Sequence, residues 1–115
     1  MKKTETELWA LIEKANWSKD HDDKRIRKEF GKLSKSVFKQ LQEFANNKTD
    51  ELHVRFQKAW LADPGIECSD DSWWDLRAEV VGRGQKFYEA ITTKKLQKMA
   101  LQMDYHENFT YSLQD

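Results

Sequence analysis

The acidic stretch from residue 63 to residue 79 is the richest part of the sequence in groups able to do chemistry. Its six carboxylates and single guanidinium give a net charge of −5, from Asp63, Glu67, Asp70, Asp71, Asp75 and Glu79 against Arg77. Carboxylates beside an exposed indole can imitate phosphate groups and enter a basic cleft of another protein. The competing interpretation is structural. Ser69, Asp70 and Asp71 would then only cap a helix, and Asp75 and Glu79 would lie on its wet face.

The pair Trp73-Trp74 lies within this stretch and divides into a core residue and a surface residue. Neighbouring side chains on a helix point about 100° apart, so both indoles cannot occupy the centre of one core. Trp73 shares a face with Leu76 and Val80, which predicts burial, whereas Trp74 pairs with Arg77 three residues later. Aromatic and arginine side chains are enriched at binding hot spots. The predicted contact surface therefore comprises Glu67, Asp70, Asp71, Trp74, Asp75, Arg77 and Glu79.

Histidine and cysteine offer little support for catalysis or metal binding. His21, His53 and His106 lie far apart, with no His-x-x-x-His or Cys-x-x-Cys spacing, so no zinc site is predicted. A carboxylate-rich turn raises the pKa of a thiol such as Cys68 and weakens it as a nucleophile. The acidic stretch also lacks the spacing of a calcium loop. We predict no catalytic residue, metal or cofactor; the alternative is an enzyme of unrecognised type using His53, Cys68 and His106.

A basic stretch from Lys19 to Lys39 is a further candidate for binding. It holds eight cations against four acids, for a net charge of +4. A nucleic-acid binder would use the cations from Lys24 to Lys39, and its affinity would fall steeply with salt. Interleaved acids and few stacking aromatics instead favour a solvated helix face. Nucleic acid is therefore the less favoured partner.

Hydrophobic periodicity places these groups on helices. Residues 8–15 form an amphipathic stripe after Thr4 and Thr6 as possible caps, and Ile26 and Phe30 indicate a short helix that ends at Gly31. A stripe from Leu33 to Phe44 predicts a helix that ends at Asn46-Asn47. We expect Thr49 to cap a separate helix over residues 52–60.

The second half of the chain is predicted to contain three more helices. The sequence Asp63-Pro64-Gly65 indicates a loop to about Ser69, and the helix that carries Trp73 follows. Gly82 and Gly84 indicate a tight corner, followed by a short helix at residues 87–91 and a last helix at residues 96–103. The tail from 108 to 115 alternates Phe109, Tyr111 and Leu113, which fits either a docked extended end or a frayed one.

The composition of the chain limits the classes of protein to which it can belong. The chain has 115 residues, 12% aromatic content and equal numbers of acidic and basic residues, which favours one folded domain, 1–115, with no overall attraction to nucleic acid or an anionic membrane. A single cysteine, Cys68, forms no internal disulfide, and no apolar run is long enough for a membrane helix. We predict a cytoplasmic all-α domain, an irregular bundle of about six helices.

Two segments together resemble a bacterial family of domains of unknown function. One is Glu7-Leu8-Trp9-Ala10-Leu11-Ile12-Glu13; the other runs from Glu67-Cys68-Ser69-Asp70-Asp71-Ser72-Trp73-Trp74-Asp75-Leu76-Arg77 to Gly82-Arg83-Gly84-Gln85-Lys86-Phe87-Tyr88-Glu89-Ala90. The likeness covers residues 7–15 and 55–91, which is 46 of 115 residues. Two parts depart from it: the Ala62-Asp63-Pro64-Gly65 approach to the cysteine turn, and residues 19–47. The resemblance implies a helical fold and a bacterial origin, and it transfers no activity.

The function predicted from these observations is a protein-binding module. Its most concrete form is an immunity-type inhibitor that occludes the active site of a toxin, such as a nuclease with a basic cleft. In this hypothesis Asp70, Asp71 and Asp75 supply negative charge, and Trp74 supplies buried area.

Overall fold

Local sequence signals set where the first helix begins and ends. The computed structural model describes residues 2–63, 65–102, 110 and 113, and helix α1 spans Glu5–Ala15. The Thr4 side chain accepts a hydrogen bond from the Glu7 N–H, and the Glu7 carboxylate accepts one from the Thr4 N–H. This reciprocal pair satisfies two amides near the helix start. The predicted first helix and its threonine cap are confirmed.

Helix α2 spans Asp23–Phe30 and follows a short 3-10 turn, Trp17–Lys19. Its Arg25 guanidinium donates hydrogen bonds to the carbonyl oxygens of Ala15 and Asn16, at 2.8 and 2.9 Å. Carbonyls at a helix end have no partner within the helix, so Arg25 fastens α2 to the end of α1. The helix predicted within the basic stretch is confirmed.

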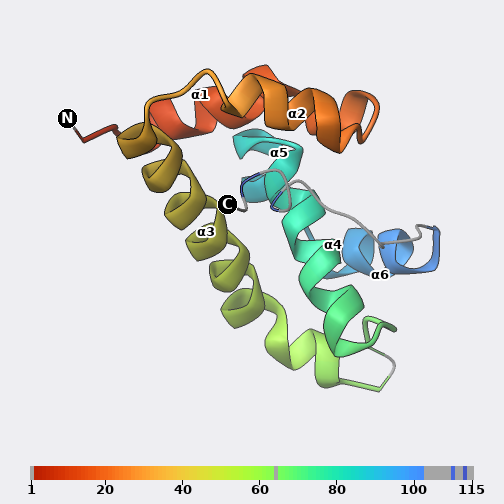
Figure 1. Cartoon of the computed structure of the whole chain (residues 1–115). Coiled ribbons are helices and arrows are strands. Elements are labelled where there is room, and N and C mark those ends of the chain that lie inside the picture. Colours follow the sequence, from red (N-terminus) through yellow and green to blue (C-terminus); the bar gives the residue numbers. More distant parts are fainter. Residues whose placement is uncertain (1, 64, 103–109, 111–112, 114–115) are drawn as a thin grey trace.

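Helix α3 spans Lys35–Leu61 and is a single helix of 27 residues. At about 1.5 Å per residue it is about 40 Å long, and it runs along one side of the described structure (Figure 1). The sequence predicted two helices here, the first ending at Asn46-Asn47 and the second capped by Thr49. That prediction is wrong, because the helix continues without interruption.

The physical reason is that burial on α3 outweighs the weak helix preference of two asparagines. Both Asn46 and Asn47 are exposed, and an exposed asparagine costs a helix only about 0.5 kcal/mol. The buried stripe crosses this point, since Ala45 precedes it and Leu52 follows it. Thr49 is fully buried, and its hydroxyl donates to the carbonyl oxygen of Ala45 at 2.8 Å instead of capping a new helix.

Helix α4 spans Asp70–Gly82 and lies beside α3 in the middle of the described structure (Figure 1). Trp73 and all residues from 75 to 82 are buried. A helix buried on almost every side is a central element of a fold. The predicted loop before it is confirmed for the described residues, because α3 ends at Leu61 and α4 begins at Asp70.

The chain then turns sharply at Gly84, as predicted. Its φ of 103° is a conformation that other residues rarely adopt, and a Cβ there would lie 2.9 Å from Glu13 Cγ. Helix α5 spans Gln85–Ala90 and helix α6 spans Thr93–Gln102. The two short helices predicted after the corner are therefore confirmed, whereas Met103 lies outside the described residues.

Aromatic side chains connect the helices in the core. Helices α1 and α2 lie across one end of α3, with α5 next to them (Figure 1). The Trp9 ring contacts Phe44 of α3 and Tyr88 of α5, with centroids 5.3 and 5.2 Å apart. Further along α3, Trp60 stacks on Trp73 of α4 at 5.4 Å and 12°. These ring contacts join helices α1, α3, α4 and α5 into one core.

The predicted fold class is confirmed. The described residues form six α-helices and no strand. None of these helices combines the length and the apolar character required to cross a bilayer. In the tail, Thr110 and Leu113 are buried, while Phe109, Tyr111 and the other tail residues lie outside the described part of the chain.

Candidate functional site

The start of α4 is capped as the sequence suggested, and its carboxylates are left exposed. Ser69 Oγ accepts a hydrogen bond from the Ser72 N–H at 3.3 Å. Asp70 and Asp71 occupy the first turn, where negative charge interacts favourably with the helix dipole. Neither carboxylate forms an ion pair or a side-chain hydrogen bond with another described residue. Capping therefore leaves both charges available to solvent.

The structure divides the seven residues of the predicted contact surface into two groups. Glu67, Asp70 and Asp71 are exposed and Trp74 is partly exposed, whereas Asp75, Arg77 and Glu79 are buried with exposed fractions of 8%, 6% and 1%. The interpretation that placed Asp75 and Glu79 on a wet face is wrong. In this conformation only Glu67, Asp70, Asp71 and Trp74 among them are accessible to a partner.

Glu79 is held by three side chains from two parts of the chain, the turn after α1 and the end of α4. Its Oε1 accepts a hydrogen bond from Trp17 Nε1 at 2.9 Å, and its Oε2 accepts one from Arg83 Nε at 2.8 Å. His21 Nε2 lies 3.0 Å from Oε1. A buried carboxylate is tolerated when its oxygens are bonded in this way, so the role of Glu79 is to join the turn after α1 to α4.

Arg77 joins α4 to α3. Its Nη1 donates to the carbonyl oxygen of Thr49 at 2.8 Å, and its Nε donates to that of Trp73 at 3.2 Å. The guanidinium carbon also lies 5.2 Å from the centre of the Trp74 ring. Burial lowers the pKa of Arg77, and the charge of Asp50 acts against this shift. Arg77 therefore positions the indole of Trp74 from inside the protein.

Trp74 forms a wall of a pocket between α3 and α4, which we call the α3–α4 pocket. Its volume is about 580 Å³, and its lining residues are Gln42, Asn46, Asp50, Trp74, Thr110 and Leu113. Asp70 and Asp71 precede Trp74 by four and three residues and so share its helix face. Asp50 is exposed on the facing helix. The pocket lining thus contains an indole and one carboxylate, Asp50, and two more carboxylates lie on the same face of α4 as Trp74, outside the lining.

The α3 side of this pocket was not predicted. Gln42, Asn46 and Asp50 are spaced by four residues and form one polar stripe on α3. The spacing was visible in the sequence, but the expected break at Asn46-Asn47 separated Asp50 from the other two residues. Interpretation of residues 35–61 as one continuous helix would have revealed the stripe.

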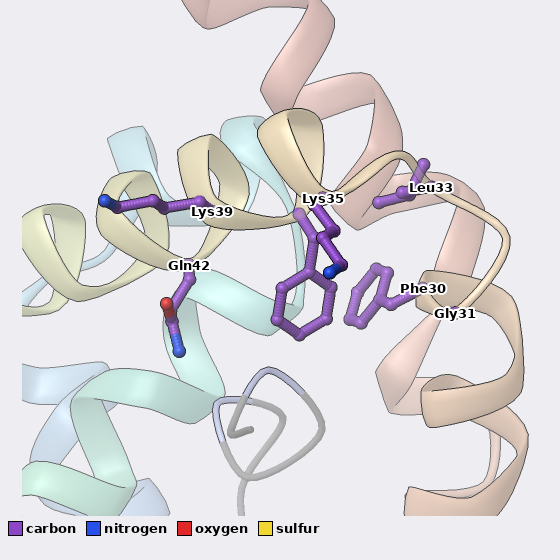
Figure 2. A pocket seen from close by; sticks show the side chains of 7 residues that line it. Phe30, Gly31, Leu33, Lys35, Lys39 and Gln42 are labelled. Atoms are coloured by element: carbon purple, nitrogen blue, oxygen red, sulfur yellow. The ribbon is translucent and has the colours of Figure 1, made fainter.

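A second pocket lies where α2 ends and α3 begins (Figure 2), and we call it the lysine pocket. Its volume is about 530 Å³, and its lining residues are Phe30, Gly31, Leu33, Lys35, Phe38, Lys39 and Gln42. Gln42 therefore lines both pockets, and its side-chain amide also donates to the carbonyl oxygen of Leu113 at 2.6 Å. The two pockets share one wall on α3.

The residues of the alternative enzyme site are only partly brought together. His53 Nδ1 accepts a hydrogen bond from Trp73 Nε1 at 2.9 Å, which places any proton of the neutral imidazole on Nε2. Trp60 Nε1 donates to the carbonyl oxygen of Cys68 at 3.2 Å, and burial raises the pKa of the Cys68 thiol, as expected in direction. His106 lies outside the described residues. No cluster of three His, Cys, Asp or Glu side chains suited to a metal occurs within the described part of the chain.

Much of the predicted basic surface is occupied by internal contacts. Arg25 bonds to Asp20 as well as to the end of α1, Arg27 pairs with Asp23, and Lys32 pairs with Glu29. These contacts leave a smaller cationic surface than the sequence suggested. Lys35 and Lys39 of the lysine pocket have no such partner among the described residues.

Comparison with known proteins places the whole chain in one family. No curated protein and no solved structure matches it. The family model of DUF4240, described as a protein of unknown function, matches residues 3–112. That match spans nearly all of the sequence and includes every lining residue of the two pockets except Leu113. The chain therefore belongs to the DUF4240 family of proteins of unknown function.

Proposed function

We propose that this domain is a protein-binding module that receives a cationic side chain of its partner in the α3–α4 pocket. The observation that carries the proposal is the presence of a partly exposed indole, Trp74, and an exposed carboxylate, Asp50, in the lining of one pocket. Asp70 and Asp71 extend the negative charge along the face of α4 that carries Trp74.

The chemistry of these groups favours arginine or lysine on the partner. A cation is attracted to the face of an indole, and the attraction strengthens where water is excluded. A guanidinium also forms charge-assisted hydrogen bonds with carboxylates such as that of Asp50. The exposed Asp70 and Asp71 would act before the complex forms, because charges near an interface accelerate the encounter of the two proteins.

The finer form of the proposal is an immunity-type inhibitor of a toxin with a basic active-site cleft. Occluding such a cleft requires an acidic surface with at least one well-packed anchor residue. The exposed carboxylates at the start of α4 supply the charge, and Trp74 supplies the anchor. Glu67, exposed on the loop before α4, extends the acidic surface away from the pocket.

The test begins with the products of neighbouring genes. Each product would be co-expressed with the domain, and the affinity and the association and dissociation rates of any complex would be measured by surface plasmon resonance. We expect Trp74→Ala to weaken the complex by about tenfold or more, chiefly through faster dissociation. The double variant Asp70→Asn/Asp71→Asn should instead slow association and flatten its salt dependence.

A matched control keeps the test specific. Glu43 is an exposed carboxylate on α3 that does not line the α3–α4 pocket, and Glu43→Gln should leave both rates unchanged. A complex that forms equally well with Trp74→Ala and Asp50→Asn would refute the proposed surface. A neighbouring toxin that retains full activity in the presence of the domain would refute only the inhibitor form.

A further inference from the structure

The lysine pocket has an apolar floor. Phe30 is 2% exposed at the end of α2. Leu33 and Phe38 are partly buried and pack against the core. The volume of about 530 Å³ falls within the range of pockets that hold small organic molecules. The floor therefore suits a compact apolar body.

The rim of the lysine pocket is cationic. Lys35 and Lys39 are exposed, and neither forms an ion pair with another described residue. Figure 2 shows the Lys35 side chain extending over the pocket towards Phe30, whereas Lys39 extends along α3 and away from Phe30. None of the seven lining residues is acidic. The pocket thus combines a hydrophobic floor with uncompensated positive charge at its mouth.

The direction of α3 adds to this charge. Lys35 is the first residue of the helix, so the positive end of the α3 dipole lies at the rim. Ser34 Oγ accepts only the N–H of Val37 among the first amides of the helix. The dipole and the Lys35 ammonium therefore favour the same kind of ligand group, an anion.

We propose that the lysine pocket binds a small carboxylate with an apolar body, such as a medium-chain or aromatic carboxylic acid. The carboxylate would pair with Lys35 at the rim, and the apolar body would cover the partly exposed Leu33 and Phe38. Lys39 would supply additional charge without direct contact. This assignment concerns a different surface from the partner site of the α3–α4 pocket and does not depend on it.

The experiment is an NMR titration of the 15N-labelled full chain with octanoate and with octanol, a neutral molecule of the same chain length. Octanoate should shift the amide signals of Gly31, Leu33 and Lys35, and it should bind about tenfold more tightly than octanol, because only the carboxylate makes a charge-assisted bond. Equal affinities for the two molecules would overturn the assignment. Shifts confined to Asp50 and Trp74 would overturn it as well.

Substitutions test the cationic rim and the apolar floor of the lysine pocket separately. Lys35→Gln should remove most of the preference for octanoate over octanol, with a smaller effect for Lys39→Gln. Phe38→Ala should weaken both ligands by about fivefold, through lost apolar contact. Lys28→Gln, an exposed lysine of α2 outside the pocket, is the matched control and should change neither affinity.

Two further outcomes are decisive. An octanoate affinity that is unchanged in Lys35→Gln would show that the charge at the rim is not used, and the proposal would fail. A peptide with phenylalanine flanked by glutamates that binds the same residues more tightly than octanoate would replace the small-molecule assignment with a protein segment. Circular dichroism of each variant excludes loss of folding as the cause.

Discussion

Glu79 is a buried carboxylate that joins two distant parts of the chain. It is 1% exposed and accepts hydrogen bonds from Trp17 and Arg83. Its partner Trp17 is 62 residues away in the chain, and no local pattern reports a contact of that range. Trp73 was predicted correctly as a core residue because its helical spacing with Leu76 and Val80 is local information.

Removing the Glu79 carboxylate should destabilise the fold strongly. In Glu79→Ala the Trp17 N–H loses its acceptor and Arg83 loses its counter-charge, so we expect a loss of roughly 3 kcal/mol in the free energy of unfolding. Urea denaturation measures this loss. Glu89→Ala removes an exposed carboxylate of α5 and should change stability by less than about 0.5 kcal/mol. Equal effects of the two substitutions would contradict the structural role of Glu79.

Glu51 predicts a pH dependence of stability. The Tyr88 hydroxyl donates to Glu51 Oε2 at 2.6 Å. This bond, helped by Lys48, holds the pKa of Glu51 below its ordinary 4.5. A carboxyl group with a lower pKa in the folded state stabilises the fold above the ordinary pKa, and this contribution is lost as pH falls through the lower value.

Comparison with Glu51→Gln isolates this effect. The variant should be less stable than the original protein at neutral pH, and the difference should shrink once Glu51 is protonated in the folded state. Urea midpoints measured at neutral pH and at about pH 3 test this. A difference that stays constant between the two pH values would show that the Glu51–Tyr88 bond does not depend on ionisation.

At the scale of elements, α3 is where prediction and structure disagree. The amphipathic stripes on either side of Asn46-Asn47 were recognised, but the asparagine pair was interpreted as a boundary. Asparagine ends a helix when it adopts the left-handed conformation, as Asn16 does with φ of 52° at the end of α1. The sequence alone does not distinguish an asparagine inside a helix from one that ends a helix, because tertiary packing decides between the two.

Two alanine substitutions distinguish the two kinds of asparagine. Asn47→Ala should raise stability by about 0.5 kcal/mol, because alanine is the better helix former at an exposed position inside α3. Asn16→Ala should lower it by about 1 kcal/mol, because alanine disfavours the left-handed conformation, and Asn16→Gly should be tolerated. Thermal unfolding monitored by circular dichroism measures all three. A loss of stability in Asn47→Ala would argue against a continuous α3.

For the molecule as a whole, the sequence predicted the all-α class and a bundle of about six helices, because helical periodicity and turn signals are local. The helices delimited one by one were one more than the structure contains, because α3 was divided in two. It did not predict the two pockets. Each pocket depends on how one helix lies against another, and that arrangement is set by contacts such as Arg77 with Thr49, 28 residues apart. Trp74, Asp70 and Asp71 were found from the sequence, but the polar stripe of Gln42, Asn46 and Asp50 that completes the α3–α4 pocket lies on a different helix and was missed.

The central position of α4 predicts a gradient of local stability across the molecule. Amides of residues 76–81 lie in a helix buried on almost every side, so their hydrogen exchange should require global unfolding. Amides of α2, where Ile26 and Phe30 are the buried residues, should exchange sooner through local opening. Hydrogen–deuterium exchange with mass spectrometry resolves these segments. Faster exchange in α4 than in α2 would contradict the prediction.

Gln42 faces both pockets and also bonds to the carbonyl oxygen of Leu113. If both pockets bind ligands as proposed, a ligand that draws this amide towards one pocket would change the wall of the other, and the two occupancies would be thermodynamically linked. Linkage is reciprocal: a carboxylate that alters the affinity for a protein partner is itself bound more or less tightly, by the same factor, when that partner is present. A single side chain would thus allow a metabolite to regulate a protein complex, and would allow the complex to retain or release the metabolite.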